Sequence, residues 1–345
     1  MENITGNSVG IDYHTESVQV QVMRADGTVA GRRRCRNSIS EVREFVVRYG
    51  DVCGVAIEAC TGSAVFAEEL RKATQWKVSL CHPGYVQRMR HNPDKSDKSD
   101  AYLLSDLNRV GYLPEVWLAP EEIRDLRTMV RYRKQLTNQR AQIKLRIRAI
   151  LRQQRVKAPP NVKNMWTKRG IAWLKSISDF PEHTSWVFAK HLAEHDHLSS
   201  LIKEADARIT VIAEKDSMIL ELAKKKGIGL FTASVIRAEI GTFSRFSNGK
   251  QLSRFCGVSP RNCSSGERQA DAGLIKAGNC LLKTVVIEAT HLLVRHDPEW
   301  KKFAARLISK GKPYSVAIGA TANRWLRKLY YEMVQIEQQP CPVAA

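Results

Sequence analysis

The order of strand-like and helix-like segments in the first 115 or so residues limits the fold more than any other feature of this chain. Alternating apolar residues predict a meander of three strands. Two further apolar runs, each following a helix-like segment, predict two more strands. The predicted strands cover residues 8–11, 17–23, 32–36, 52–57 and 77–80, and the predicted helices cover residues 40–49 and 63–74. A meander followed by βαβ units fits an α/β layer of RNase H type, although other mixed-sheet α/β domains share this order.

Two long helical patterns follow this α/β region. Apolar residues at helical spacing run through residues 121–156, where two prolines end the pattern, and again through residues 185–214. Their narrow apolar stripes predict an antiparallel hairpin or coiled coil, or a dimerising one. From Lys224 onward the pattern is that of a compact, mostly helical domain with a loose tail.

The charge of the chain points to a polyanionic partner. Its 55 Lys and Arg against 35 Asp and Glu give a formal net charge of +20, and nucleic acid is the polyanion that we expect. Residues 124–157 contain twelve Lys and Arg and one Asp, a run that repels itself unless a polyanion neutralises it. A merely solvated basic face is the alternative. The candidate nucleic-acid contacts on this helix are Arg131, Arg133, Lys134, Arg140, Lys144 and Arg148.

Four carboxylates are placed where they could act together. Asp12 stands in an otherwise apolar strand, where an acid is costly to bury unless it is paired or binds a cation. Glu58 ends the central apolar strand, and Asp97 and Asp100 lie three residues apart at the start of a predicted helix. If the first and central strands are neighbours, the four acids converge, and we predict that they hold Mg²⁺ against a phosphate. Helix capping by the later pair and an Asp12–arginine ion pair are the alternatives.

Cysteine usage and hydropathy predict a cytoplasmic protein. The eight cysteines form no CxxC pair, and no secretory signal is visible at the start of the chain. We therefore expect reduced thiols rather than disulfides or a zinc site. No apolar run approaches the ~18 residues that a membrane helix needs, so we expect no membrane partner.

Three short motifs around the acids resemble a known family. Gly10-Ile11-Asp12, Ile57-Glu58-Ala59 and the segment Lys-Ser-Asp-Lys-Ser-Asp-Ala at residues 95–101 are similar to the D, E, D, D signature of the DEDD transposases of bacterial insertion sequences. That family includes bridge-RNA-guided serine recombinases, and Piv-type DNA invertases are related to it. Further motifs match the C-terminal transposase domain of the family in order and spacing. They lie at residues 227–229, 255–261, 265–266 and 276–279. One departure lies after Glu58, where Ala-Cys-Thr-Gly replaces the Ala-Thr-Gly of many members. The conformation of the turn that follows Glu58 is therefore not predicted.

The resemblance implies three domains. They are a RuvC-like metal-binding catalytic domain of RNase H type, a basic coiled-coil segment, and a mostly helical transposase domain that carries a serine nucleophile. We place them at residues 1–118, 119–222 and 223–336, with a loose tail at 337–345.

The resemblance also assigns roles to particular residues. Asp12, Glu58, Asp97 and Asp100 would bind Mg²⁺ and be catalytic, and Ser265 would attack a DNA phosphodiester to form a covalent phosphoserine link. Composition alone does not separate Ser265 from Ser264. Arg261 and Lys276 become candidate phosphate contacts, with a plain surface role as the alternative.

The partners implied by the resemblance are donor and target double-stranded DNA, a structured non-coding guide RNA, and further copies of the chain, as a homodimer that assembles into a tetramer. The expected location is the nucleoid of a bacterial cytoplasm. Two other functions stay open. One is a RuvC-like Mg²⁺-dependent nuclease or Holliday junction resolvase, in which water attacks the phosphate. The other is a non-catalytic nucleic-acid-binding protein whose acids are structural.

Overall fold

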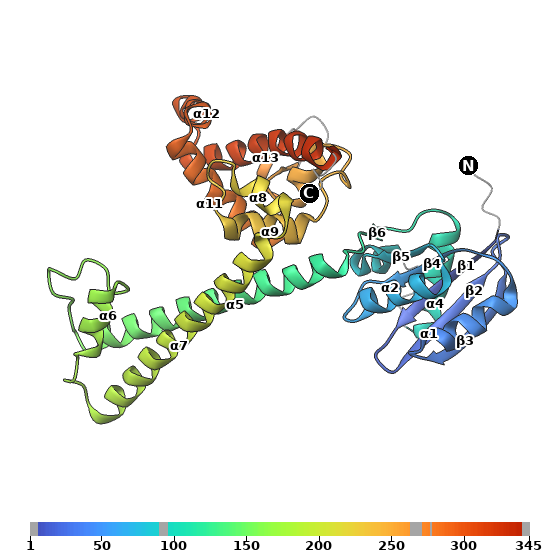
Figure 1. Ribbon diagram of the computed structural model, residues 1–345, viewed down its shortest axis with the longest axis horizontal. Coiled ribbons are helices and arrows are strands. Elements are labelled where there is room, and N and C mark those ends of the chain that lie inside the picture. Colours follow the sequence, from blue (N-terminus) through green and yellow to red (C-terminus); the bar gives the residue numbers. More distant parts are fainter. Residues whose placement is uncertain (1–5, 90–95, 263–270, 277, 340–345) are drawn as a thin grey trace, which may run out of the picture. The chain divides into compact units, whose positions relative to one another are not determined.

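A computed structural model describes residues 6–89, 96–262, 271–276 and 278–339 of this chain. The chain forms two compact units, Met1–Pro120 and Glu121–Ala345 (Figure 1). The first unit is built on a mixed α/β sheet, and the second is largely helical. The predicted mixed α/β class of the first part of the chain and the predicted mostly helical class of the rest are therefore confirmed.

The first unit contains a six-stranded sheet with the strand order β3-β2-β1-β4-β5-β6. β1 pairs antiparallel with β2 and parallel with β4, and β3 forms one edge of the sheet. The five strands predicted from the sequence are all present, whereas β6 has only two residues and is too short to carry a readable alternation. The strands are β1 Asn7–Tyr13, β2 Ser17–Met23, β3 Val29–Arg36, β4 Val52–Glu58, β5 Val78–Cys81 and β6 Glu115–Val116.

One face of the sheet carries the apolar core of this unit. Because side chains alternate along a strand, Val9 and Ile11 of β1 point to the same face as Val20 of β2. They pack there against helix α1 (Ile39–Val46), which continues into the short helix η1 (Val47–Tyr49), and against helix α2 (Ser63–Thr74).

Helix α4 (Asp97–Arg109) packs against β1, β2 and β4 on the opposite face. A Cβ atom at Gly10 of β1 would collide with the carbonyl oxygen of Ala101, so glycine at this position allows the helix to lie close to the strand. The Ser8 hydroxyl donates to the carbonyl oxygen of Ser105 at 2.8 Å, and the Asn108 amide donates to the Ser8 hydroxyl at 2.7 Å. These contacts fix the position of α4 along β1.

Two short helices, α3 (Pro83–Val86) and η2 (Gln87–Met89), follow β5.

The second unit begins with a helical hairpin. Its two long helices are α5 (Glu121–Gln153) and α7 (Glu182–Ala213), which lie side by side in Figure 1. Val130 near the start of α5 shares a core with Ile209 near the end of α7, so the helices are antiparallel. Helix α6 (Lys168–Lys175) closes the far end of the hairpin by burying Leu174 against it. Both long helices were predicted from the sequence to within three residues at each end.

The rest of the second unit is a helical bundle with one β-hairpin. Its core gathers apolar residues from α9, α11 and α13 around the buried Phe243. The hairpin of β7 (Pro260–Asn262) and β8 (Asp271–Leu274) was not predicted, because its strands of three and four residues are too short to show a pattern. The helices of this bundle are α8 Ser217–Ala223, α9 Leu230–Ile240, α10 Gly249–Phe255, α11 Cys280–His296, α12 Pro298–Ser309 and α13 Tyr314–Gln338.

Two expectations about the whole chain can be compared with the described residues. None of their helices combines the length and apolar character that crossing a bilayer requires. The six cysteines whose side chains are described form no disulfide with one another.

Candidate active site

The carboxyl ends of β1 and β4 bring two of the four acids to neighbouring positions. Ile11 of β1 pairs with Ile57 of β4 in parallel register, and each is followed at once by an acid, Asp12 or Glu58. Alternation places both acids on the face that carries α4, because Gly10 of β1 and Gly54 of β4 contact that helix. The strand neighbourhood on which the predicted convergence depended is therefore present.

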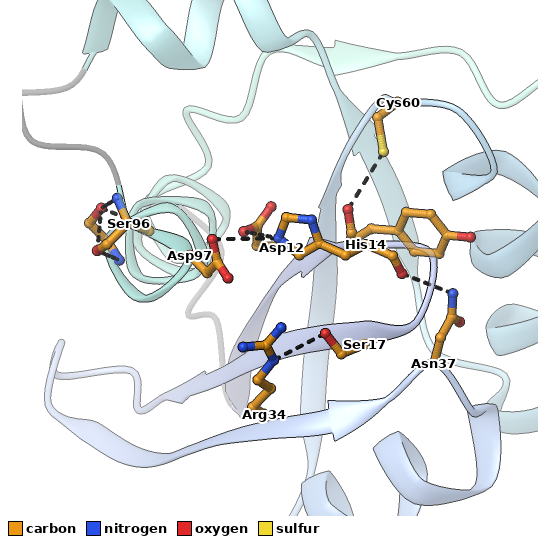
Figure 2. A network of polar contacts seen from close by, with 10 residues as sticks. Asp12, His14, Ser17, Arg34, Asn37, Cys60, Ser96 and Asp97 are labelled. Carbon is orange, nitrogen blue, oxygen red and sulfur yellow. Dashed lines mark hydrogen bonds and ion pairs between the residues drawn. The ribbon is translucent and has the colours of Figure 1, made fainter.

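The start of α4 brings a third acid to the same place. The Ser96 hydroxyl accepts a hydrogen bond from the Ser99 backbone N–H at 3.1 Å, and the Ser99 hydroxyl accepts one from the Ser96 backbone N–H. Ser96 therefore caps the helix. Helix capping by Asp97 or Asp100, the alternative role, is therefore wrong. Asp97 lies instead in the first turn, with its carboxylate directed toward Asp12 (Figure 2).

His14 joins the two carboxylates. Its Nε2 lies 3.2 Å from Asp12 Oδ2 and 3.5 Å from Asp97 Oδ1, and one ligand atom from each of the three residues falls within a 4.8 Å cluster. Asp12 thus has a histidine partner, and no arginine pairs with it among the described residues. Sequence reasoning missed His14, although the Asp-x-His spacing places both side chains on one face of an extended strand.

Electrostatics at the site favour a bound cation. The Asp12 side chain is only 13 % exposed. This burial raises the pKa of its carboxyl, the Asp100 and Asp97 charges raise it further, and His14 opposes them. Asp100 is buried one helical turn beyond Asp97. Carboxylate oxygens suit a hard divalent metal ion, and an imidazole nitrogen is a more typical ligand of transition metals, so these residues fit a divalent metal ion without specifying which one.

Glu58 belongs to the same negative field. Its charge adds to burial in raising the pKa of the Cys81 thiol to about 12, and the charges of Glu58 and Asp12 both raise the pKa of the Cys60 thiol, whose main cause is again burial. The conformation of the turn after Glu58, which the sequence did not predict, is stabilised by the Ser63 side chain. Its hydroxyl accepts from the Cys60 N–H at 3.0 Å and donates to the Cys60 carbonyl oxygen at 2.9 Å.

Two predicted nucleic-acid contacts on α5 also hold the second unit together. Arg131 forms two hydrogen bonds with Glu239 of α9, at 2.8 and 2.9 Å. Arg133 contacts Asp206 of α7 at 2.9 Å, and its guanidinium lies 4.2 Å from the centre of the Phe231 ring. Both guanidiniums therefore have partners within the unit, and their role in nucleic-acid binding stays a prediction.

The other predicted α5 contacts lie along the hairpin. The Arg140 guanidinium donates to the Ser199 hydroxyl at 3.3 Å, and Lys144 and Arg148 lie over the Trp166 ring. Lys134 borders an open groove of about 630 Å³ between α5 and the start of α11. The α5 side of this groove also carries Arg131, Gln135, Asn138, Gln139 and Gln142.

Two C-terminal motifs meet in the second unit. A Cβ atom at Gly278 would lie 3.0 Å from the Cα of Gly257, so the segments that contain Phe255-Cys256-Gly257 and Gly278-Asn279 are in close contact. The exposed Arg261 and Lys276 flank these segments at the β7–β8 hairpin. Ser265, the predicted nucleophile, and Ser264 lie outside the described residues.

Comparisons with known proteins agree with this arrangement. Residues 9–155 match the model of the DEDD transposase family of IS110 type. Residues 221–305 match the model of the transposase IS116/IS110/IS902 family. A protein named as a probable family 20 transposase of Pseudomonas aeruginosa is 25 % identical over 93 % of this chain and 95 % of its own length. The transposase for insertion sequence element IS1111A of Coxiella burnetii is 22 % identical over 84 % of this chain and 78 % of its own. The transposase for element IS1328 of Yersinia enterocolitica is 23 % identical, covering 86 % and 85 %.

Proposed function

We propose, from its matches to transposases of the IS110/IS116 type, enzymes that cut and rejoin DNA, that this chain exchanges DNA strands with Ser265 as the nucleophile. Asp12, Glu58, Asp97 and Asp100 form the metal-binding half of the site, on a RuvC-like domain. The divalent metal is Mg²⁺. Arg261 and Lys276 contact the phosphate beside Ser265.

One observation supports this proposal most strongly: the Asp12 and Asp97 carboxylates lie on either side of one imidazole, although burial and the Asp100 and Asp97 charges disfavour the ionised form of Asp12. An arrangement that stores repulsion in this way is typical of a functional site rather than a stabilising one. A divalent metal held by these acids would stabilise negative charge on a phosphate oxygen and would lower the pKa of a nearby hydroxyl. The acids hold the metal, and the packing of α4 on Gly10 fixes their separation.

The proposed chemistry conserves the number of phosphoester bonds. The Ser265 Oγ attacks the scissile phosphorus, an Oγ–P bond forms, and the bond from phosphorus to the 3′-oxygen breaks. The proton lost by the serine hydroxyl is returned to the departing 3′-oxygen. Because the 5′-phosphoserine link keeps the bond energy of the phosphodiester, reversal of this step joins the strand to a new 3′-hydroxyl without an external energy source.

The proposed partners follow from the charge of the chain and from the family. The basic residues of α5 bind donor and target DNA together with a structured guide RNA. Two copies of the chain form a homodimer, with α5 and α7 as its coiled coil, and dimers associate into a tetramer. The acids of one protomer then act with Ser265 of another.

Trapping of a covalent intermediate tests the serine chemistry. The full-length protein, purified together with the RNA encoded by its native flanking DNA, is incubated with Mg²⁺ and a nicked DNA substrate that carries an end of the element, so that the cleaved strand diffuses away and rejoining fails. We expect a protein–DNA species that survives denaturation with the wild type and with Ser264→Ala, and none with Ser265→Ala. Ser264→Ala is the matched control because the two serines are adjacent.

Cleaved DNA without any covalent species in the wild type would overturn the serine mechanism and favour hydrolysis by water, as in a resolvase. The absence of cleavage with every divalent metal and substrate tried would favour the non-catalytic alternative.

Sequencing of co-purified RNA tests the guide. The protein is expressed together with its native flanking DNA and purified under non-denaturing conditions. We expect one discrete, structured RNA encoded beside the gene, because the family resemblance implies such a guide. A mixture of cellular RNA fragments, or no RNA, would contradict RNA guidance and indicate that the protein itself reads its DNA sites.

A further inference from the structure

A groove with basic walls opens beside the acids. It lies between the sheet and the first turn of α4, has a volume of about 620 Å³, and is lined by Gln19, Arg32, Arg34, Ser96, Asp97 and Lys98. Arg34 sits opposite Gln19 in the β2–β3 register, and Gln19 sits opposite Asp12 in the β1–β2 register. The β3 arginines therefore lie two strands away from Asp12, on the same face of the sheet. Figure 2 shows the Arg34 guanidinium on the side from which Asp12 and Asp97 project.

Neighbouring side chains hold the two β3 arginines in place. Arg32 Nε donates to Gln21 Oε1 at 2.6 Å, and Arg34 Nε donates to the Ser17 hydroxyl at 3.0 Å. In the part of the chain that the structure describes, Arg33 is the β3 arginine with a carboxylate partner, and neither Arg32 nor Arg34 forms an ion pair. Both side chains are exposed. Their Nε atoms are thus oriented by neutral partners, while their charges remain available to an anion.

Arg33, between them, is different. It also borders the groove, but its Nη2 lies 3.9 Å from Glu41 Oε1 on α1, and α1 packs on the opposite face of the sheet. The strand therefore directs two of its three consecutive arginines to the acid face and one to the other face.

We propose that Arg32, Arg34 and Lys98 bind the phosphodiester backbone of the DNA strand that enters the acid site. This proposal deepens the proposed function and rests on it. Four carboxylates repel an approaching phosphate, and the two positive charges of one Mg²⁺ ion cannot neutralise all four. Cations beside the acids offset this repulsion, and a guanidinium matches a phosphate through two parallel hydrogen bonds. Orientation of the Nε atoms before binding reduces the entropy lost on contact.

A competing explanation is that arginines on the edge strand β3 only prevent pairing with other sheets. Under that explanation all three arginines act alike. Under the phosphate explanation Arg32 and Arg34 bind DNA, and Arg33 does not. The comparison of the two faces of β3 therefore separates the explanations.

DNA binding by the full-length protein tests the proposal. Affinity is measured by fluorescence anisotropy in EDTA across a salt series, with a labelled random-sequence DNA duplex and the same sequence as an RNA duplex. We expect Arg32→Gln/Arg34→Gln to weaken DNA binding about tenfold and to make the slope of log K against log [salt] about 1.8 less steep, because each lost phosphate contact removes about 0.9. Lys98→Gln, which removes one contact, should make the slope about 0.9 less steep, half of the change in the double variant. Arg33→Gln should bind as the wild type does.

Three results would overturn the proposal: no change in slope with the double variant and with Lys98→Gln, an equal loss with Arg33→Gln, or a loss confined to the RNA duplex. Residual binding is expected from the basic helix α5 in every variant. Because the measurement needs neither metal nor turnover, failure of the serine mechanism would leave its outcome unchanged, and the two proposals can fail separately.

Discussion

Replacement of Asp12 by asparagine is expected to reduce DNA strand exchange by about a thousandfold or more, a loss of about 4 kcal/mol in transition-state stabilisation. The amide is nearly isosteric with the carboxylate but carries no charge and is a poor ligand for a hard cation. Asp97→Asn should have the same effect, because its Oδ1 lies in the same cluster of ligand atoms. The measurement is the rate of recombination between plasmids that carry donor and target sites, at saturating Mg²⁺.

Two controls separate loss of catalysis from loss of structure. Asp106 lies on the same helix α4 but pairs with Arg109 at 2.6 Å, so Asp106→Asn should keep near wild-type activity. Mixing of the Asp12→Asn and Ser265→Ala proteins should restore part of the activity, since the proposed site combines acids and serine from different protomers. Full activity of Asp12→Asn would remove this carboxylate from the mechanism.

The stability of the same variant should change in the opposite direction. Since the pKa of Asp12 is raised on folding, its ionised form is disfavoured in the folded state, and this cost appears as pH rises through the raised pKa. At neutral pH without metal, Asp12→Asn should therefore increase the free energy of unfolding and raise the Tm of the first unit, as measured by thermal denaturation. Added Mg²⁺ should stabilise the wild type more than the variant.

Much of the first unit could be predicted because its strands alternate clearly. Val18, Val20 and Val22 are all completely buried, and their spacing alone indicated β2. The acids at the ends of β1 and β4 were predicted to converge on the condition that these two strands are neighbours, because the carboxyl ends of neighbouring parallel strands lie at one edge of a sheet. Local pattern therefore placed Asp12 and Glu58 at strand ends, and the pairing of β1 with β4 in the structure met the condition for their convergence.

The remaining features depend on contacts that no local pattern encodes. His14 lies just beyond β1, and its importance is evident only once Asp97, 83 positions later in the sequence, is in place. The close packing of α4 on β1 depends on the absence of a side chain at Gly10. In the sequence, Gly10 was noted only as part of the motif around Asp12. In the same way, the positive charge of α5 predicted a nucleic-acid partner. It could not show that Arg131 is paired with Glu239, which lies 108 positions later in the sequence.

Substitution of that partner, Glu239, should cause a large loss of stability in the second unit. Its side chain is 2 % exposed and accepts two hydrogen bonds from Arg131 and one from the Asn279 amide at 2.6 Å. Arg127 lies 3.7 Å from the same carboxylate, and burial already lowers the pKa of that guanidinium. Glu239→Ala should lower the free energy of unfolding by about 3–5 kcal/mol, because it leaves partly buried cations uncompensated. Chemical denaturation of the full-length protein measures this loss.

A matched control and a double-mutant cycle identify the cause. Glu221, which pairs with Lys224 on the surface of α8, should cost at most about 1 kcal/mol when replaced by alanine. If the cost at Glu239 comes from stranded cations, Arg131→Ala with Glu239→Ala should lose less than the two single variants together. Strict additivity would contradict this. The cycle also bears on nucleic-acid binding, because an Arg131 variant that binds DNA weakly is informative only after its structural cost has been measured.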